Sequence, residues 1–109
     1  MLVSLDPVVG SEQGKVRPAV IVSNNAASDS AARRGRGVIT VVPITSNVRN
    51  VYPFQVLVRA EDSGLPVDSK AQAEQVRSVS TERLVRRIGQ LDREVMRQLD
   101  DALRLHLSL

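Results

Sequence analysis

Cysteine and tryptophan are absent from this chain of 109 residues, and histidine occurs once, at position 106. Without cysteine, the chain can form no disulfide bond and no thiolate metal site. His106 falls near the end of a predicted C-terminal helix, where the helix dipole favours a basic side chain. We therefore interpret it as a surface residue and expect no Ser-His-Asp catalytic triad.

Aromatic side chains are also scarce, since Tyr52 and Phe54 are the only two. Nucleic-acid binding by bases stacked on a row of aromatic rings is therefore not expected. The sequence has no apolar run of membrane length and no secretory signal before residues 2–4. These absences predict a cytoplasmic protein without a membrane partner.

The acidic residues are not arranged for metal-dependent hydrolysis. The pairs Glu61-Asp62 and Asp100-Asp101 each consist of sequence neighbours, which point to different sides of a helix or strand. The first pair also opens a predicted loop, where solvated carboxylates are common. We therefore predict no metal and no other cofactor.

The formal charge of +3 is concentrated in the first part of the chain. Residues 1–60 hold seven Lys and Arg against three Asp and Glu, whereas residues 61–109 hold eight against nine. An anionic partner for the basic part is consistent with this asymmetry. The length corresponds to a single domain, residues 1–109, which is large enough to fold around its own core.

Short β-rich segments between turn residues predict a small, strongly curved antiparallel barrel packed by one C-terminal helix. We expect strands at residues 3–5, 18–23, 38–45, 53–58 and 85–90, two extended pieces within residues 68–79, and one helical turn at residues 80–84. The segment 18–23 has the composition of a strand buried on both faces. Pro43 is expected at a sheet edge or a bulge, because it has no backbone donor.

The C-terminal helix carries its own start signal and an apolar stripe. Asp92 is the predicted N-cap, and the basic residues near the end of the helix suit its dipole. The residues that form the apolar stripe at helical spacing are Val95, Met96, Leu99, Ala102, Leu103 and Leu107.

The polar loop at residues 10–18 is the stretch with the strongest chemical signal. It carries Lys15 and Arg17 near Glu12, and it runs directly into the apolar segment 19–22. Arg17 stands at the start of a predicted strand, where packing can hold its guanidinium still for bidentate recognition of a phosphate. The alternative is a solvated hairpin loop, with Arg17 in a surface salt bridge.

Several segments, taken in order along the chain, resemble the MazF/PemK/Kid toxins, which are sequence-specific endoribonucleases of bacterial toxin–antitoxin pairs. They are Asp6-Pro7, Gly10-Ser11-Glu12-Gln13-Gly14, Arg17-Pro18-Ala19-Val20-Ile21-Val22-Ser23-Asn24, Val42-Pro43-Ile44-Thr45-Ser46-Asn47, Tyr52-Pro53-Phe54, Asp68-Ser69, Glu74-Gln75-Val76-Arg77 and Arg87-Ile88-Gly89, followed by an amphipathic helix. The match covers nearly the whole chain. It implies an SH3-like barrel of the type shared with the CcdB gyrase poisons, a homodimer, and a cognate MazE-like antitoxin.

The chain departs from the family pattern in two places. Members usually carry several residues, including a Gly-Asp pair, before the segment equivalent to residues 2–5. The first strand is therefore expected to be clipped, which leaves its pairing for the structure to decide. Some Kid-like members have a histidine where Ser11 stands and an aspartate where Ser80 stands, so neither of those roles transfers to this chain.

The resemblance implies that Arg17 and Thr45 are the catalytic pair. Arg17 can neutralise charge on a phosphorane, and Thr45, at the end of a β-branched strand, can offer its hydroxyl to a phosphate oxygen. For Thr45 the alternative is an ordinary strand-end residue. Glu12 is a candidate general base, with an exposed loop charge as the alternative. The further residues that could contact RNA are Ser11, Gln13, Lys15, Ser46, Asn47, Glu74, Gln75 and Arg77.

We therefore expect a metal-independent, sequence-selective endoribonuclease that cuts single-stranded RNA, chiefly mRNA, by attack of the ribose 2′-hydroxyl. The products would be a 2′,3′-cyclic phosphate and a 5′-hydroxyl, and the resemblance implies a toxin that arrests growth. Loop residues 24–36 and 46–52 are expected to tune which RNA sequence is read. The alternatives are a non-enzymatic gyrase poison of the CcdB type and an inactive RNA-binding regulator.

Overall fold

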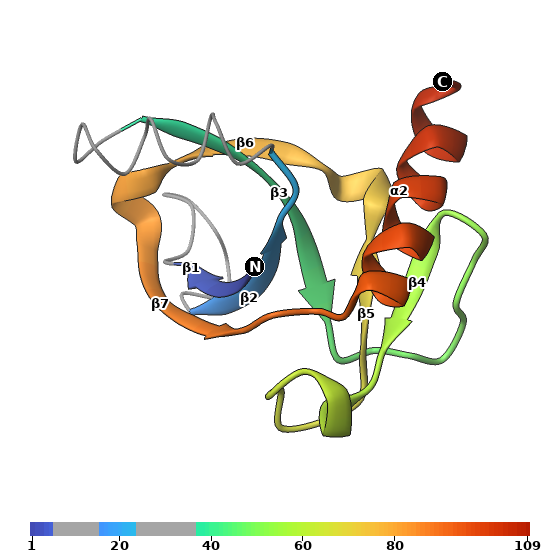
Figure 1. Cartoon of the computed structure of the whole chain (residues 1–109), viewed down its shortest axis with the longest axis horizontal. Helices are drawn as coiled ribbons and strands as arrows, with labels where there is room; N and C mark the ends of the chain where they lie inside the picture. The colour runs from blue at the N-terminus through green and yellow to red at the C-terminus, as the bar shows by residue number, and fades with distance from the viewer. Residues whose placement is uncertain (6–15, 24–36) are drawn as a thin grey trace.

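The computed structural model describes residues 1–5, 16–23 and 37–109, and these form a curled antiparallel sheet packed by one long helix (Figure 1). The predictions for Ser11, Glu12, Gln13, Lys15 and loop 24–36 lie outside the described residues. Within the described part, no helix is long and apolar enough to cross a bilayer. The predicted antiparallel, strongly curved architecture with a terminal helix is confirmed, and among the described residues the sheet curls without closing into a complete barrel.

The sheet contains seven short strands. They are β1 (Leu2–Leu5), β2 (Arg17–Ile21), β3 (Val38–Thr45), β4 (Gln55–Val58), β5 (Ser69–Gln72), β6 (Arg77–Ser80) and β7 (Leu84–Gly89). Short 3₁₀ turns lie at η1 (Ala60–Asp62), η2 (Ala73–Gln75) and η3 (Thr81–Arg83), and the helix α2 spans Arg93–Leu107. β4 begins at Gln55 rather than at residue 53, because a turn closed by the Gln55 N–H on the Tyr52 carbonyl (2.8 Å) precedes it.

Strand β3 is the centre of the sheet, whose order is β4-β5-β3-β2-β1-β7, with β6 also paired to β3. Residues 38–41 of β3 pair with β6, whereas Ile44 and Thr45 pair with β5. Pro43 lies between these two registers and opposite Ala19 of β2. The prediction of a sheet edge was therefore wrong: Pro43 stands in the central strand where it changes partner, so the missing N–H interrupts neither ladder.

The first strand is paired along its whole length. Leu2, Val3, Ser4 and Leu5 each have a partner on β2 and a partner on β7, with register shifts on the β7 side. All four residues are buried. The expected first strand is therefore an inner strand of the sheet.

Consecutive residues of the inner strands enter two different apolar clusters, one on each face of the curled sheet. Leu2, Val20 and Val42 pack with Leu99 of the helix. Their sequence neighbours Val3, Ala19 and Val41 form the second cluster, together with Leu5, Ile39 and Val79. Because side chains alternate across a strand, both faces are covered, as predicted for segment 18–23.

Helix α2 begins as predicted and buries one stripe of apolar residues. The Asp92 carboxylate accepts a hydrogen bond of 2.8 Å from the N–H of Val95, which makes it the N-cap. Leu99 and Ala102 are buried, and Val95, Met96 and Leu103 pack at the margin of the first cluster. Leu107 is 50% exposed, so its assignment to the stripe was wrong, because the last turns extend beyond the sheet (Figure 1).

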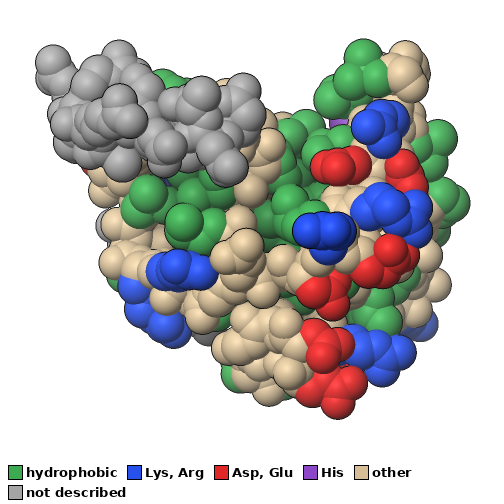
Figure 2. Space-filling model, viewed as in Figure 1, with side chains coloured by type: hydrophobic (Ala, Val, Ile, Leu, Met, Phe, Trp, Pro, Cys, Tyr) green, Lys and Arg blue, Asp and Glu red, His purple; other side chains and the backbone are tan. Residues whose placement is uncertain are grey.

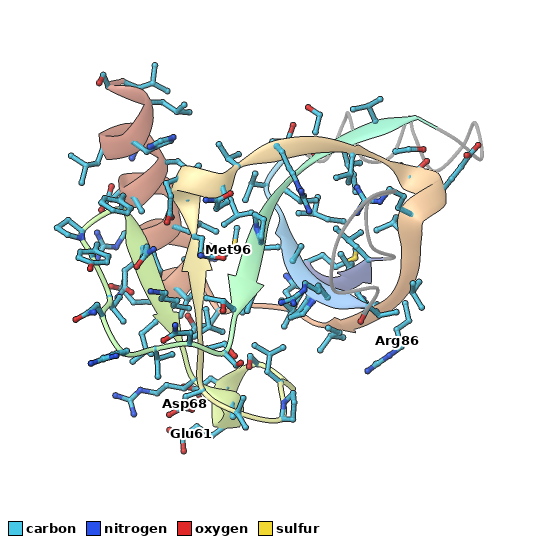
Figure 3. All side chains as sticks on the ribbon, turned by 180° about the vertical axis from the view of Figure 1, so that it is seen from behind. Glu61, Asp68, Arg86 and Met96 are labelled. Atoms are coloured by element: carbon cyan, nitrogen blue, oxygen red, sulfur yellow. The ribbon has the colours of Figure 1, made fainter. Side chains whose placement is uncertain are left out.

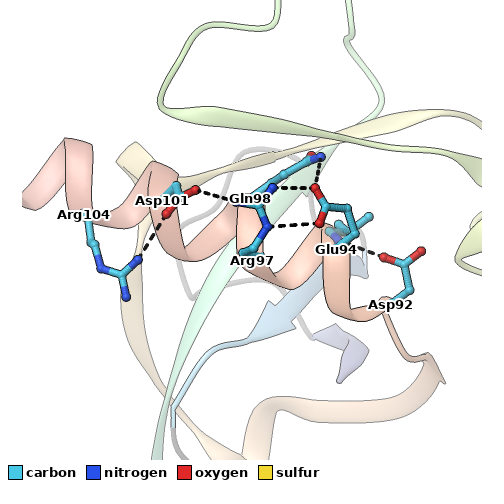
Figure 4. A network of polar contacts seen from close by, with 7 residues as sticks. Asp92, Glu94, Arg97, Gln98, Asp101 and Arg104 are labelled. Atoms are coloured by element: carbon cyan, nitrogen blue, oxygen red, sulfur yellow. Dashed lines mark hydrogen bonds and ion pairs between the residues drawn. The ribbon is translucent and has the colours of Figure 1, made fainter.

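The outer face of α2 carries ion pairs between neighbouring turns (Figure 4). Arg97 contacts Glu94 at 2.6 Å and Asp101 at 3.3 Å, and Arg104 contacts Asp101 at 3.1 Å. The hydrogen bonds from Arg97 and Gln98 lower the pKa of the Glu94 carboxyl. These charges are exposed, so they support the helix locally and mark its solvent side.

Gly89, at the end of β7, provides a test of the packing between this strand and η1. A Cβ placed on Gly89 would lie 2.7 Å from the backbone carbonyl oxygen of Ser63, which is too close for any side chain. Gly89→Ala should therefore lower the free energy of unfolding by about 1–3 kcal/mol. Ser78→Ala, at an exposed strand position, should change it by less than about 0.5 kcal/mol. Denaturant unfolding checks this, and equal stability of the two variants would contradict the close approach.

Candidate functional site

A hollow of about 470 Å³ opens at the ends of β2 and β3. Its walls include Pro18 and Ile44 from these two strands and the apolar segment 65–67 that follows η1. The pairing of β2 with β3 ends at Ala19 and Pro43, just before the hollow. The residues at its rim, Arg17 and Ser46, come from the matched segments of the sequence.

The hollow is electropositive. Arg17 and Arg86 both contribute to its lining, and none of the lining residues that the structure describes is an Asp or Glu. Within the described ranges, neither guanidinium forms an ion pair, so the surface salt bridge considered for Arg17 is not seen there. Two exposed arginines without a local carboxylate form a site for an anion, and a guanidinium is suited to phosphate oxygens.

Thr45 lies between Ile44 and Ser46, which line the hollow, but it is not itself one of the lining residues. The Thr45 Oγ1 accepts a hydrogen bond of 3.2 Å from the N–H of Asn47. Its hydroxyl proton remains available for a second oxygen, such as that of a phosphate.

Ser46 and Asn47 begin the exposed loop of residues 46–54 that joins β3 to β4, and we call this segment the 46–54 loop. Ser46 lines the hollow. The Asn47 Oδ1 accepts a hydrogen bond of 3.2 Å from the N–H of Arg49, which leaves the side-chain amide of Asn47 to donate outward. Both side chains lie beside Thr45, where bases flanking a bound phosphate would be read.

The structure separates the other predicted RNA contacts from the hollow. Glu74 directs its Oε2 to the Gln55 side chain at 2.7 Å, and its Oε1 is buried without a hydrogen-bond partner in the described residues. Gln75 on η2 and Arg77 on β6 are exposed, and Arg77 is paired with Val41. None of the three lines the hollow, so their contact with RNA stays a prediction.

Sequence reasoning missed two basic residues near this site, Arg86 and Lys70. Arg86 and Arg87 are adjacent on β7, and the sequence could show only that they alternate between the faces of a strand. Arg86 is one of the residues that line the hollow, and Figure 3 shows its side chain extending outward from the sheet, away from Glu61 and Asp68. Lys70 stands out in the sequence as a cation among small residues, but its burial on β5 is visible only in the fold.

The space-filling view shows how charge is distributed over one face of the molecule. In Figure 2, acidic and basic side chains alternate along α2, whereas the opposite lower part of that face carries basic side chains without acidic neighbours. Among the described residues, no group of three or more His, Cys, Asp or Glu side chains could hold a metal ion. The charged side chains of β7 itself are the exposed Arg86 and Arg87.

Comparisons with known proteins agree on one family. The family described as "PemK-like, MazF-like toxin of type II toxin-antitoxin system" matches residues 1–107. The chain is 61% identical to Endoribonuclease MazF9 of Mycobacterium tuberculosis over 98% of this chain and 91% of that protein. It is 36% identical to Endoribonuclease EndoA of Bacillus subtilis, over 96% and 87% of the two chains. The fold is also that of the Mycobacterium tuberculosis toxin MazF-mt6, with a TM-score of 0.78, 24% identity, and coverage of 100% and 98%.

Proposed function

Because the chain belongs to the PemK-like, MazF-like toxin family of type II toxin–antitoxin systems, we propose that it cuts single-stranded RNA at selected sequences without a metal ion. It is an endoribonuclease toxin, as its named relatives are, and the substrate class and the chemistry are the proposal. Such an enzyme acts on mRNA in the cytoplasm. The observation that carries the proposal is the hollow at the ends of β2 and β3, whose lining, among the described residues, includes two arginines and no carboxylate.

The reaction needs no group beyond the RNA and the protein side chains. The ribose 2′-oxygen attacks the adjacent phosphorus and loses its proton to a base, while the bond from phosphorus to the 5′-oxygen breaks. The leaving oxygen takes up a proton, so the products are a 2′,3′-cyclic phosphate and a 5′-hydroxyl. Negative charge grows on the phosphorane oxygens, and preorganised donors at that position lower the barrier.

Arg17 and Thr45 fit two of these roles. The Arg17 guanidinium at the rim of the hollow can donate two hydrogen bonds to the phosphorane. It can also supply the proton that the leaving oxygen takes up. We propose that the Thr45 hydroxyl donates to another oxygen of the same phosphate. The base stays unassigned, because Glu12, its candidate, lies outside the described residues.

We propose two protein partners on the same grounds. A type II toxin is held inactive by its antitoxin, and an acidic, initially disordered segment that orders over the arginines would compete directly with RNA. We also propose a homodimer, because a chain of this size has a short core and a closed two-fold pair would extend it. A gyrase poison of the same fold would need protein contacts instead of a phosphate site, and the hollow favours the nuclease.

Substitution at the cut site tests the mechanism. Replacing the ribose there by deoxyribose should abolish cleavage and preserve binding, because only the nucleophile is lost. Cleavage should continue in EDTA.

Arg17→Ala should slow cleavage about 10²–10³-fold, the usual effect of removing one donor to the transition state. Arg17→Lys should stay slow, since an ammonium lacks the bidentate fork. Thr45→Val should slow cleavage while the domain stays folded.

Gel mapping of the RNA ends provides the measurement. Efficient cutting of the deoxy-substituted RNA, or activity that returns only when Mg²⁺ is added after chelation, would overturn the proposed chemistry. A supercoiling assay with gyrase serves as the control for the alternative function, and we expect it to show no inhibition.

Arg86 should bind a phosphate next to the one that is cut. Arg86→Ala should weaken binding of a deoxy-substituted RNA and lower the slope of log K against log salt by roughly 0.7, the effect of one phosphate contact on a single strand. Arg87→Ala is the matched control, because Arg87 already bonds the Gln90 side chain at 3.2 Å and does not line the hollow. Equal effects of the two variants on affinity and slope would remove Arg86 from the site.

The homodimer predicts about twice the chain mass of 11.9 kDa in sedimentation at micromolar concentration. An RNA-cutting species that sediments with the mass of a single chain would contradict the dimer and leave the chemistry intact.

A further inference from the structure

Lys70 is a buried cation next to the proposed site. Only 7% of its surface is exposed, and its Nζ donates a hydrogen bond of 2.6 Å to the backbone carbonyl of Asn50. The same Nζ lies 5.7 Å from the centre of the Tyr52 ring, within reach of a cation–π contact. No ion pair to Lys70 is seen in the described ranges. Burying a lysine ammonium group removes its contacts with water, which costs free energy. The hydrogen bond to Asn50 and the contact with the Tyr52 ring offset part of that cost.

Both contacts of Lys70 are made to the 46–54 loop. Asn50 lies in the middle of this loop, and Tyr52 lies near its end, where its ring stacks on Phe54 with centres 5.5 Å apart. Lys70 itself belongs to β5, which pairs with both strands that the loop connects: Thr45 of β3 and Leu57 of β4 are its partners. Lys70 therefore connects the 46–54 loop to β5 of the sheet.

A second attachment holds the end of the loop. The Gln55 Oε1 accepts a hydrogen bond of 3.2 Å from the Tyr52 N–H, and the Gln55 Nε2 donates to Glu74 at 2.7 Å. Pro53 occupies the second position of the turn between Tyr52 and Gln55, which suits its fixed φ. Glu74 thus supports the loop through Gln55.

We propose that Lys70 is a positioning residue for RNA selectivity, which fixes the 46–54 loop so that Ser46 and Asn47 meet the flanking bases in one arrangement. This inference rests on the proposed RNA cleavage. Residues 46–53 are exposed, and in the early part of the loop the described hydrogen bonds run from the N–H groups of Asn47 and Arg49 to nearby side chains. A loop ordered before binding loses less entropy on contact with RNA, and it presents the same donors to every substrate.

The position of Lys70 links selectivity to the cut. Thr45 and Lys70 are directly paired across β3 and β5, so the residue proposed to touch the phosphate and the residue that holds the loop are strand neighbours. Movement of the loop relative to β5 would therefore change which base lies beside Thr45, without removing Arg17 or Thr45 from the site. We call the contacts of Lys70 with Asn50 and Tyr52 the clamp. Loss of the clamp should alter sequence preference and KM more than kcat.

Amide hydrogen exchange tests the clamp independently of RNA. Lys70→Met keeps the length of the side chain and removes the donor and the charge. Exchange of peptide 46–54 should become about tenfold faster in this variant, while that of β3 and α2 stays unchanged. Unchanged exchange in the loop would overturn the clamp. If Lys70→Met does not fold, Lys70→Gln makes the same comparison, since its shorter side chain does not reach Asn50.

Cleavage profiling on a long RNA tests the consequence for selectivity. Lys70→Met should cut about tenfold more sites and show a higher KM, with a smaller change in kcat. Arg93→Met, at an exposed position at the start of α2, removes the same charge as a control and should keep the wild-type profile. A Lys70→Met enzyme that is less stable but keeps the wild-type profile would show a purely structural role and overturn the proposal. A wild-type protein that cuts no RNA would instead overturn the proposed function, and the exchange experiment would still decide the clamp.

Discussion

The end of the β2–β3 ladder at the pair Ala19–Pro43 is the constraint on which the site depends. Directly paired strands bring opposite Cβ atoms to about 5 Å, which leaves no room for a phosphate between their side chains. Beyond that pair each strand end is supported from its outer side: Arg17 by Leu5 of β1, and Thr45 by Lys70 of β5. We propose that these two side chains contact one phosphate, while their backbones stay in ordered strands.

Local signals in the sequence were sufficient for most of the fold. The β-branched run before Thr45 predicted β3, the apolar segment 18–23 predicted a strand buried on both faces, and Asp92 predicted the start of α2. Each signal depends on side-chain shape, alternation or capping within a few residues, and these are properties of the local chain. The matched segments likewise placed Arg17 and Ser46, which the fold brings to one hollow.

Features of the structure that depend on residues far apart in the sequence could not be predicted. Pro43 was expected at a sheet edge or a bulge, because the sequence does not show that a central strand can change partner at that residue. Leu107 continues the helical spacing but lies past the end of the sheet, so the pattern was right and the burial wrong. The buried contact of Lys70 with Asn50 and the partnership of Glu74 with Gln55 each join residues about twenty positions apart, and no periodicity reports such pairs.

The geometry divides two tasks that a selective nuclease must perform. Phosphates are the same in every RNA, so the contacts of Arg17 and Arg86 can position a strand but cannot choose among sequences. The choice must come from side chains that meet base edges, and among the described residues near the hollow we assign this role to the exposed 46–54 loop. An exposed loop discriminates only if its donors and acceptors hold still, because a loop that adapts accepts many sequences. In our proposal, the buried Lys70 on the adjacent strand supplies that restraint without adding charge to the surface that binds phosphates. Affinity and selectivity can therefore be altered separately by mutation.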